Sequence, residues 1–152
     1  MQSILRPLNR LAPWAPTLLR VVLGVIMAYH GFKKFDNGIE GFEAMLKGLD
    51  VPLPELAAPL TAGVELVGGI LLIVGLATRI SAAAIFLVLV GAVWLVTFDL
   101  GLISEIGEMP GMERDFSIMV GLAAVFLLGP GRLSVDEMLG LEEDSPIEAP
   151  VA

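Results

Sequence analysis

The chain has 152 residues, of which 56% are hydrophobic, and its mean hydropathy is +0.84. The formal net charge of −8 excludes nucleic-acid binding through a basic surface, because phosphate contacts require clustered lysine and arginine. Cysteine is absent, which excludes disulfides, thiolate catalysis, iron–sulfur clusters and cysteine-ligated zinc. The apolar residues form long blocks, and a block of about 20 residues can cross a bilayer. We therefore expect one integral membrane domain.

The N-terminal lead, residues 1–16, contains Arg6 and Arg10 and no acidic residue. The apolar run that follows lacks the small-residue cleavage pattern of a signal peptide. We therefore expect this run to be retained as the first membrane span, over residues 17–35. Trp14 suits the membrane–water interface, where amphipathic aromatic side chains gather.

A long loop, residues 36–55, follows the first span. Its apolar residues recur at helical spacing with charged residues between them, which predicts a short amphipathic helix on the membrane surface or across the end of the bundle. Pro52 and Pro54 are expected to end this helix. The apolar residues of the loop are Ile39, Phe42, Met45, Leu46 and Leu49.

Three further spans are predicted. Thr78 and Arg79 leave room only for a tight connection, so the second and third spans form an antiparallel hairpin. The fourth span is short for a bilayer, and Gly129-Pro130-Gly131 ends it. The three ranges are 56–77, 80–98 and 114–129, the membrane domain as a whole covers 17–132, and a polar tail covers 133–152.

Only helices and closed barrels satisfy the backbone hydrogen bonds in lipid, and these long runs are helical. We therefore predict an all-α fold, an antiparallel four-helix membrane bundle with a short amphipathic helix in its first long loop. An even number of spans places both termini on one side, and the acid-free, arginine-bearing lead favours the cytoplasmic side.

Each predicted span carries small or polar residues spaced three and four apart, and such stripes pack against neighbouring helices in a membrane. Arg20 and Arg79 are expected to snorkel toward lipid headgroups. The four stripes, span by span, are Arg20, Leu23, Met27, His30 and Lys34; Thr61, Glu65, Gly68, Leu72, Gly75 and Arg79; Ala84, Leu87, Gly91, Trp94 and Phe98; and Arg114, Ser117, Gly121, Ala124 and Leu128.

Glu65 falls about nine residues into the second span, roughly 13 Å from its loop end by the helical rise. An unpaired ionised carboxylate at that depth costs several kcal/mol, so a partner such as His30 or Lys34 is expected. Two interpretations stay open, a buried pair that fixes helix register and a binding pocket with a proton-active carboxylate and imidazole. The ionisable residues expected at this end of the bundle are His30, Lys34, Glu65, Asp99, Glu113, Arg114 and Asp115.

Four short motifs, taken in order, resemble the DoxX family of bacterial four-helix membrane proteins over residues 18–139. They are Tyr29-His30-Gly31-Phe32 with Lys34, Glu65-Leu66-Val67-Gly68-Gly69, Leu76-Ala77-Thr78-Arg79, and Gly129-Pro130-Gly131-Arg132-Leu133-Ser134-Val135-Asp136.

The resemblance implies an inner-membrane location. The family is similar to the membrane subunit of thiosulfate:quinone oxidoreductase, which implies a function in redox reactions that involve a quinone. It also implies functional positions at His30, Lys34, Glu65, Arg79 and Arg132. The chain departs from the family pattern at Met112-Glu113-Arg114, where an aromatic residue often precedes the glutamate, and at Asp99, where a histidine is frequent.

The first functional hypothesis is a redox-associated membrane protein that binds a quinone or similar small molecule at the long-loop end. Glu65 and His30 would be catalytic, and Lys34, Asp99, Glu113 and Arg114 would be ligand-binding. No metal site and no covalently bound cofactor are expected, because one histidine without cysteine makes a poor metal site. The expected partners are membrane lipid, a redox or respiratory protein, and a second copy of the chain.

The second hypothesis is a non-catalytic accessory or anchoring subunit of a larger membrane complex, so the residues alone leave open whether the chain is an enzyme. A third hypothesis, transport of a small solute, is disfavoured because four spans leave little room for alternating access.

Overall fold

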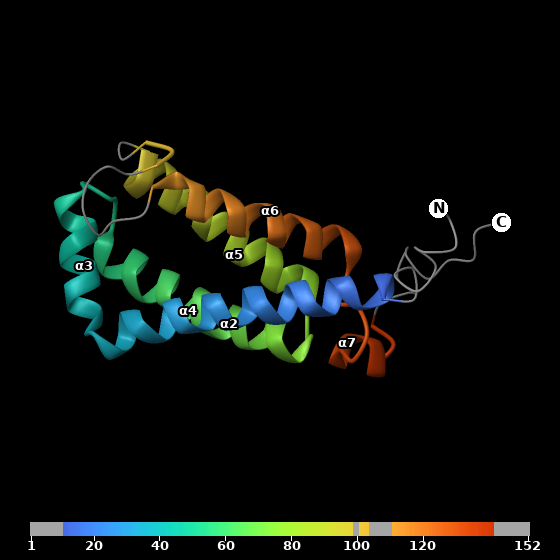
Figure 1. The fold of residues 1–152 in the computed structure, drawn as a ribbon. Helices are drawn as coiled ribbons and strands as arrows, with labels where there is room; N and C mark the ends of the chain where they lie inside the picture. The colour runs from blue at the N-terminus through green and yellow to red at the C-terminus, as the bar shows by residue number, and fades with distance from the viewer. Residues whose placement is uncertain (1–10, 99–100, 104–110, 142–152) are drawn as a thin grey trace.

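The computed structural model describes residues 11–98, 101–103 and 111–141 (Figure 1). Every regular element in these ranges is helical, which confirms the predicted all-α fold. The elements are η1 (Ala12–Trp14), α2 (Ala15–Asp36), α3 (Ile39–Gly48), α4 (Pro54–Val74), α5 (Thr78–Ala92), the π-helical segment η2 (Val93–Thr97), α6 (Met112–Leu128) and α7 (Val135–Met138).

The bundle consists of two helix pairs, α2 with α4 and α5 with α6, joined through the α4–α5 hairpin. Figure 1 shows the two pairs diverging toward the end where α3 lies. α3 is the predicted amphipathic helix, and it packs across that end against α4 and α2. α7 lies at the opposite end, where the two pairs meet (Figure 1).

Three of the helices in the described ranges are long and apolar enough to cross a membrane: Ala12–Asp36, Pro54–Val74 and Thr78–Thr97. α6 has 17 residues, which corresponds to about 25 Å of helix. It packs beside α5 and α2 at the position of the predicted fourth span, residues 114–129, whose crossing of the membrane stays a prediction.

One predicted role of the loop prolines is wrong. α3 ends at Gly48, before either proline, and Pro54 stands in the first turn of α4. Proline suits that position because its missing N–H would have no partner in the first turn of a helix.

The predicted stripes of α2 and α4 face the bundle, and that of α5 was assigned wrongly. The α6 stripe lies beside the buried face, and its Gly121 packs against Leu23 of α2. Leu87, Trp94 and Phe98 are 68%, 76% and 58% exposed. Lipid tails are as apolar as a leucine side chain, so large apolar residues face outward without cost. The buried residues are Thr78, Ser81, Ala82, Ile85 and Leu89 on α5, and Asp115, Ile118, Leu122 and Val125 on α6.

Helices α2 and α4 approach until their backbones touch. A Cβ atom at Gly31 would lie 2.3 Å from the backbone nitrogen of Leu66, and one at Gly69 would lie 2.3 Å from the nitrogen of Ala28. Gly24 meets the carbonyl of Gly69 in the same way, at 2.7 Å. Such contacts are how helices associate in lipid, where packing of small residues replaces the hydrophobic effect.

Arg20 does not snorkel to headgroups, as the sequence suggested, because its side chain is 1% exposed. Its guanidinium donates hydrogen bonds to the carbonyls of Leu72 (2.8 Å) and Ile73 (2.6 Å) at the end of α4. It also donates to the carbonyls of Pro130 (2.6 Å) and Leu133 (2.7 Å) after α6. The planar guanidinium has five N–H donors, so one side chain satisfies carbonyls from two segments.

Part of the predicted polar tail is docked on the bundle. The Asp136 carboxylate, on α7, accepts hydrogen bonds from the backbone N–H groups of Ala77 (2.8 Å) and Thr78 (2.9 Å). It thereby caps the start of α5, whose first N–H groups have no partner within the helix. The Asp136 N–H donates to the carbonyl of Gly75 at 2.8 Å. The Gly129–Asp136 motif is therefore explained by closure of this end of the bundle.

We expect Gly31→Ala to lower the free energy of unfolding by roughly 1–3 kcal/mol, since the new methyl group would overlap the α4 backbone. Gly63→Ala is the matched control, because a Cβ atom there meets nothing within 4 Å. Thermal unfolding in detergent, followed by circular dichroism, measures both. Equal stability of the two variants would contradict the close α2–α4 contact.

We expect Asp136→Ala to cost roughly 1.5–3 kcal/mol of stability through loss of two charge-assisted hydrogen bonds. Glu137→Ala removes the same charge from an exposed neighbouring position and serves as the control. A denaturation midpoint lowered only for Asp136→Ala supports the capping role, and equal shifts would refute it.

Candidate functional site

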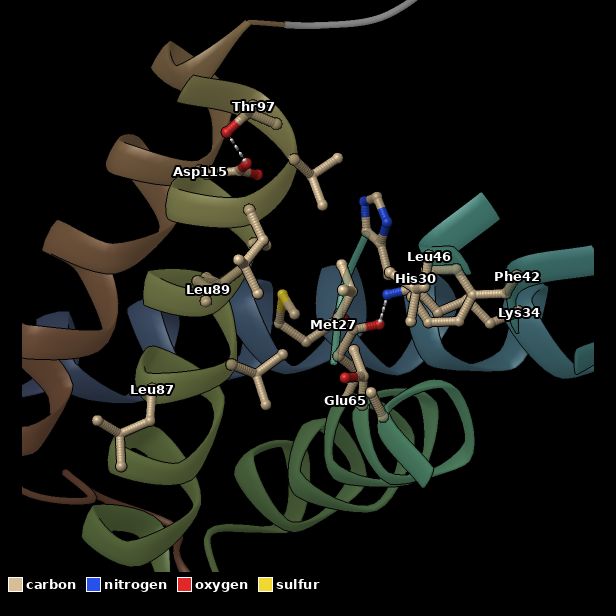
Figure 2. A pocket seen from close by; sticks show the side chains of 18 of the residues that line it. Met27, His30, Lys34, Phe42, Leu46, Glu65, Leu87, Leu89, Thr97 and Asp115 are labelled. Atoms are coloured by element: carbon tan, nitrogen blue, oxygen red, sulfur yellow. Dashed lines mark hydrogen bonds and ion pairs between the residues drawn. The ribbon is translucent and has the colours of Figure 1, made fainter. Parts of the chain in front are cut away.

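A cavity of about 390 Å³ lies between the two helix pairs at the end covered by α3 (Figure 2). Small-molecule sites commonly measure about 300–1,000 Å³ and combine apolar walls with a few polar groups. This cavity has that character, since leucine, valine, methionine and alanine form most of its wall. Its polar lining residues are His30, Lys34, Thr61, Glu65, Thr97, Arg114 and Asp115.

Lys34 of α2 and Glu65 of α4 form an ion pair on one side of the cavity. Their side chains are 22% and 5% exposed, so the carboxylate is shielded while the ammonium reaches toward the α3 end. The Lys34 ammonium also lies 4.8 Å from the ring centroid of Phe42 on α3, a cation–π contact. Glu65 thus has the partner that its depth in the bilayer requires.

A second ion pair, between Arg114 and Asp115, lies on the α5–α6 side of the cavity, and the Thr97 hydroxyl group hydrogen bonds to it. The Asp115 carboxylate is 1% exposed and accepts from Arg114 at 2.9 Å and from the Thr97 hydroxyl at 3.2 Å. Thr97 is the last residue of the π-helical segment η2, and π-helical turns are frequent at functional sites. The π-helical turn η2 therefore directs the Thr97 hydroxyl group toward the buried Asp115 carboxylate and gives it a second hydrogen-bond partner.

His30 lies one helical turn before Lys34 and is half-buried. Figure 2 shows its imidazole near the Lys34 ammonium, inside the cavity. No other residue in the described ranges hydrogen bonds to its ring. An imidazole without a protein partner can donate to or accept from a ligand.

The structure brings His30, Lys34, Glu65 and Arg114 to one cavity, as the helical spacing suggested. Glu113 does not line it; its Oε2 atom is buried without a hydrogen-bond partner among the described residues. Asp99 lies outside the described residues.

Several lining residues were not assigned to the site from the sequence. Asp115 was predicted at this end of the bundle but was given no role in the site. It shares a helix face with Ile118, Leu122 and Val125, and an acid in register with a buried apolar stripe is a signal that could have assigned it. No signal in the sequence pointed to Phe42 or Thr97. The role of Phe42 depends on how α3 folds back over the bundle, and that of Thr97 depends on the π-helical turn. No group of three histidine, cysteine or acidic residues suited to a metal ion occurs in the part of the chain described.

Comparison with known proteins gives a consistent picture. The sequence pattern that defines the DoxX family matches residues 15–97. The Bacillus subtilis protein named "Putative oxidoreductase CatD" is 34% identical over 119 residues, covering 78% of this chain and 82% of the relative. An uncharacterized membrane protein of Mycobacterium tuberculosis is 28% identical over 141 residues, covering 88% of this chain and 86% of the relative. No solved structure matches the chain.

The Lys34–Glu65 pair predicts an asymmetric response to its two single substitutions. Lys34→Met leaves a carboxylate that is 5% exposed without its partner, and we expect a loss of roughly 3–5 kcal/mol. Glu65→Gln leaves an ammonium that can turn toward water, and about 1–2 kcal/mol is expected. The double variant should lose less than the sum of the two. Chemical denaturation in detergent measures all three, and additive losses would show that the pair is uncoupled.

Proposed function

This chain belongs to the DoxX family, and from that premise we propose that it is a redox-associated membrane protein that binds a quinone or a similar small molecule in the cavity. The observation that carries the proposal is the cavity itself, in which hydrogen-bond donors and two ion pairs lie in an apolar enclosure at one end of a membrane bundle.

The donor set fits a quinone headgroup. A quinone has a flat apolar ring and two carbonyl oxygens that accept hydrogen bonds. His30, Lys34 and Arg114 offer N–H donors around the cavity, and methionine, leucine and valine side chains offer contacts for the ring.

In this proposal Glu65 and His30 handle protons. Reduction of a quinone to a quinol takes up two electrons and two protons. After taking up protons from water, His30 as an imidazolium and Glu65 as a carboxylic acid would each donate one proton to a carbonyl oxygen. The electrons come from a partner protein or a reduced substrate. The name of the Bacillus relative, "Putative oxidoreductase CatD", supports the redox association.

We further propose that the chain resides in a bacterial inner membrane with both termini on the cytoplasmic side. The acid-free N-terminal lead with Arg6 and Arg10 supports this orientation. The cavity and α3 then lie toward the opposite side of the membrane.

The test is to purify the protein in mild detergent and identify bound small molecules by mass spectrometry. We expect a quinone in the wild type and in Glu40→Gln, which changes an exposed carboxylate of α3 outside the cavity. Glu65→Gln and His30→Ala should retain the fold. Their affinity for the quinone should fall about tenfold or more, equivalent to about 1.4 kcal/mol of binding free energy.

Two outcomes would contradict the proposal. Equal quinone content in Glu65→Gln and the wild type would exclude this cavity as the site. A stoichiometric protein partner in every sample, without any small molecule, would favour a non-catalytic accessory or anchoring subunit, in which the Lys34–Glu65 pair serves only to fix helix register.

A further inference from the structure

Two cavity-lining residues, Gly91 of α5 and Leu95 of η2, also reach the outside of the bundle. They are spaced four apart and line the cavity, yet Leu95 is 42% exposed and a Cβ atom added at Gly91 would meet nothing within 4 Å. A residue that borders a cavity and also faces outward stands at an opening. The cavity therefore reaches the outer surface along this line of residues.

The opening lies on the flank of α5 that faces α4. Gly68 of α4 packs against Ile85 of α5, where an added Cβ atom would lie 3.1 Å from the Ile85 side chain. Continuing from this contact toward the α3 end, the cavity is lined by Thr61 and Ala57 of α4 and by Val88 and Ala92 of α5. The two helices are therefore in contact near their hairpin and separate toward α3.

Gly91 stands at the middle of this opening. A Cβ atom at Gly91 would meet nothing within 4 Å, so the space beside it is empty. A long side chain there has room to enter the opening.

The depth of the opening indicates where it leads. Trp94 is 76% exposed, and its ring centroid lies 6.0 Å from that of Phe98. Exposed aromatic side chains at the end of a span are typical of the membrane–water interface. Gly91 lies three residues, or about 4.5 Å of helical rise, farther from that end, so the opening extends from the interface at Leu95 toward hydrocarbon at Gly91.

We propose that the cavity opens sideways into the bilayer through a portal between α4 and α5, bordered by Ala57, Thr61, Gly91 and Leu95. The ligand is an amphiphile. Its small polar head lies among the ionised residues of the cavity, and its apolar chain extends through the portal into lipid. This inference rests on the proposed function, since it takes the cavity as a ligand site, and it excludes a purely water-soluble ligand as the natural one.

Chain selectivity is the first test. The probes are a benzoquinone ring without a side chain and the same ring carrying a decyl chain, with binding followed by quenching of tryptophan fluorescence. Gly91→Leu should weaken binding of the decyl compound by about tenfold or more, because the leucine side chain occupies the portal, and leave the chainless ring unaffected.

Gly63→Leu is the matched control, since Gly63 also has open space beside it and does not line the cavity. It should bind both compounds as the wild type does. If Gly91→Leu affects the two compounds equally, or neither, the portal proposal is overturned while quinone binding by the wild type still supports the proposed function.

A second measurement needs no quinone. The chain has no cysteine, so Thr61→Cys introduces a single thiol at the portal. In liposomes this thiol should react with a lipid-soluble maleimide faster than with a charged, membrane-impermeant one, and adding Gly91→Leu should slow the reaction. Leu60→Cys, at a position 67% exposed on the same helix, should react at a rate that Gly91→Leu does not change.

Together the two measurements separate the ideas. If Gly91→Leu slows the reaction of the thiol but no quinone binds, the portal proposal is supported and a quinone is excluded as the ligand. Reaction of the Thr61→Cys thiol with the charged maleimide alone would refute the portal.

Discussion

The contact between the backbones of α2 and α4 is the constraint on which the candidate site depends. Gly31 abuts Ala62 and Leu66 with no room for a methyl group, and this fixes both the separation and the register of the two helices. Lys34 lies one turn beyond Gly31, and Glu65 precedes Leu66, so the same contact brings the ammonium to the carboxylate. The ion pair is therefore a consequence of glycine packing, and a looser α2–α4 contact would separate two charges within the bilayer.

The two ends of the bundle are built in opposite ways. At the α7 end the buried Arg20 guanidinium and the Asp136 carboxylate bind backbone groups and join α2, α4, α5 and the segment after α6. At the α3 end the charged side chains bind one another around a cavity. The helix pairs are joined at the α7 end and diverge toward the α3 end, where the cavity lies (Figure 1).

The sequence predicted the elements and half of their faces. Long apolar runs identified the spans, and the spacing of Ile39, Phe42 and Leu46 identified α3. The buried faces of α2 and α4 were predicted correctly. Arg20 and Glu65 are charged and avoid lipid, and Met27 packs in the core, so all three side chains point into the bundle. The face of α5 was wrong because lipid accepts Leu87 and Trp94 as readily as a protein core does, and the stripe predicted for α6 lies beside the buried face. Phe42 and Thr97 entered the site through tertiary contacts that no local pattern encodes.

The pairing of every acid with a base around the cavity has an electrical consequence. Lys34 balances Glu65 and Arg114 balances Asp115, so the four groups together contribute no net charge, although the whole chain carries −8. Moving one elementary charge across a membrane potential of 100 mV changes its energy by about 2.3 kcal/mol. The potential does no net work on a neutral molecule that moves between the lipid and a cavity without net charge. Occupancy by a neutral ligand is then independent of voltage, and only a proton moving to or from Glu65, His30 or the ligand would make the site respond to the membrane potential.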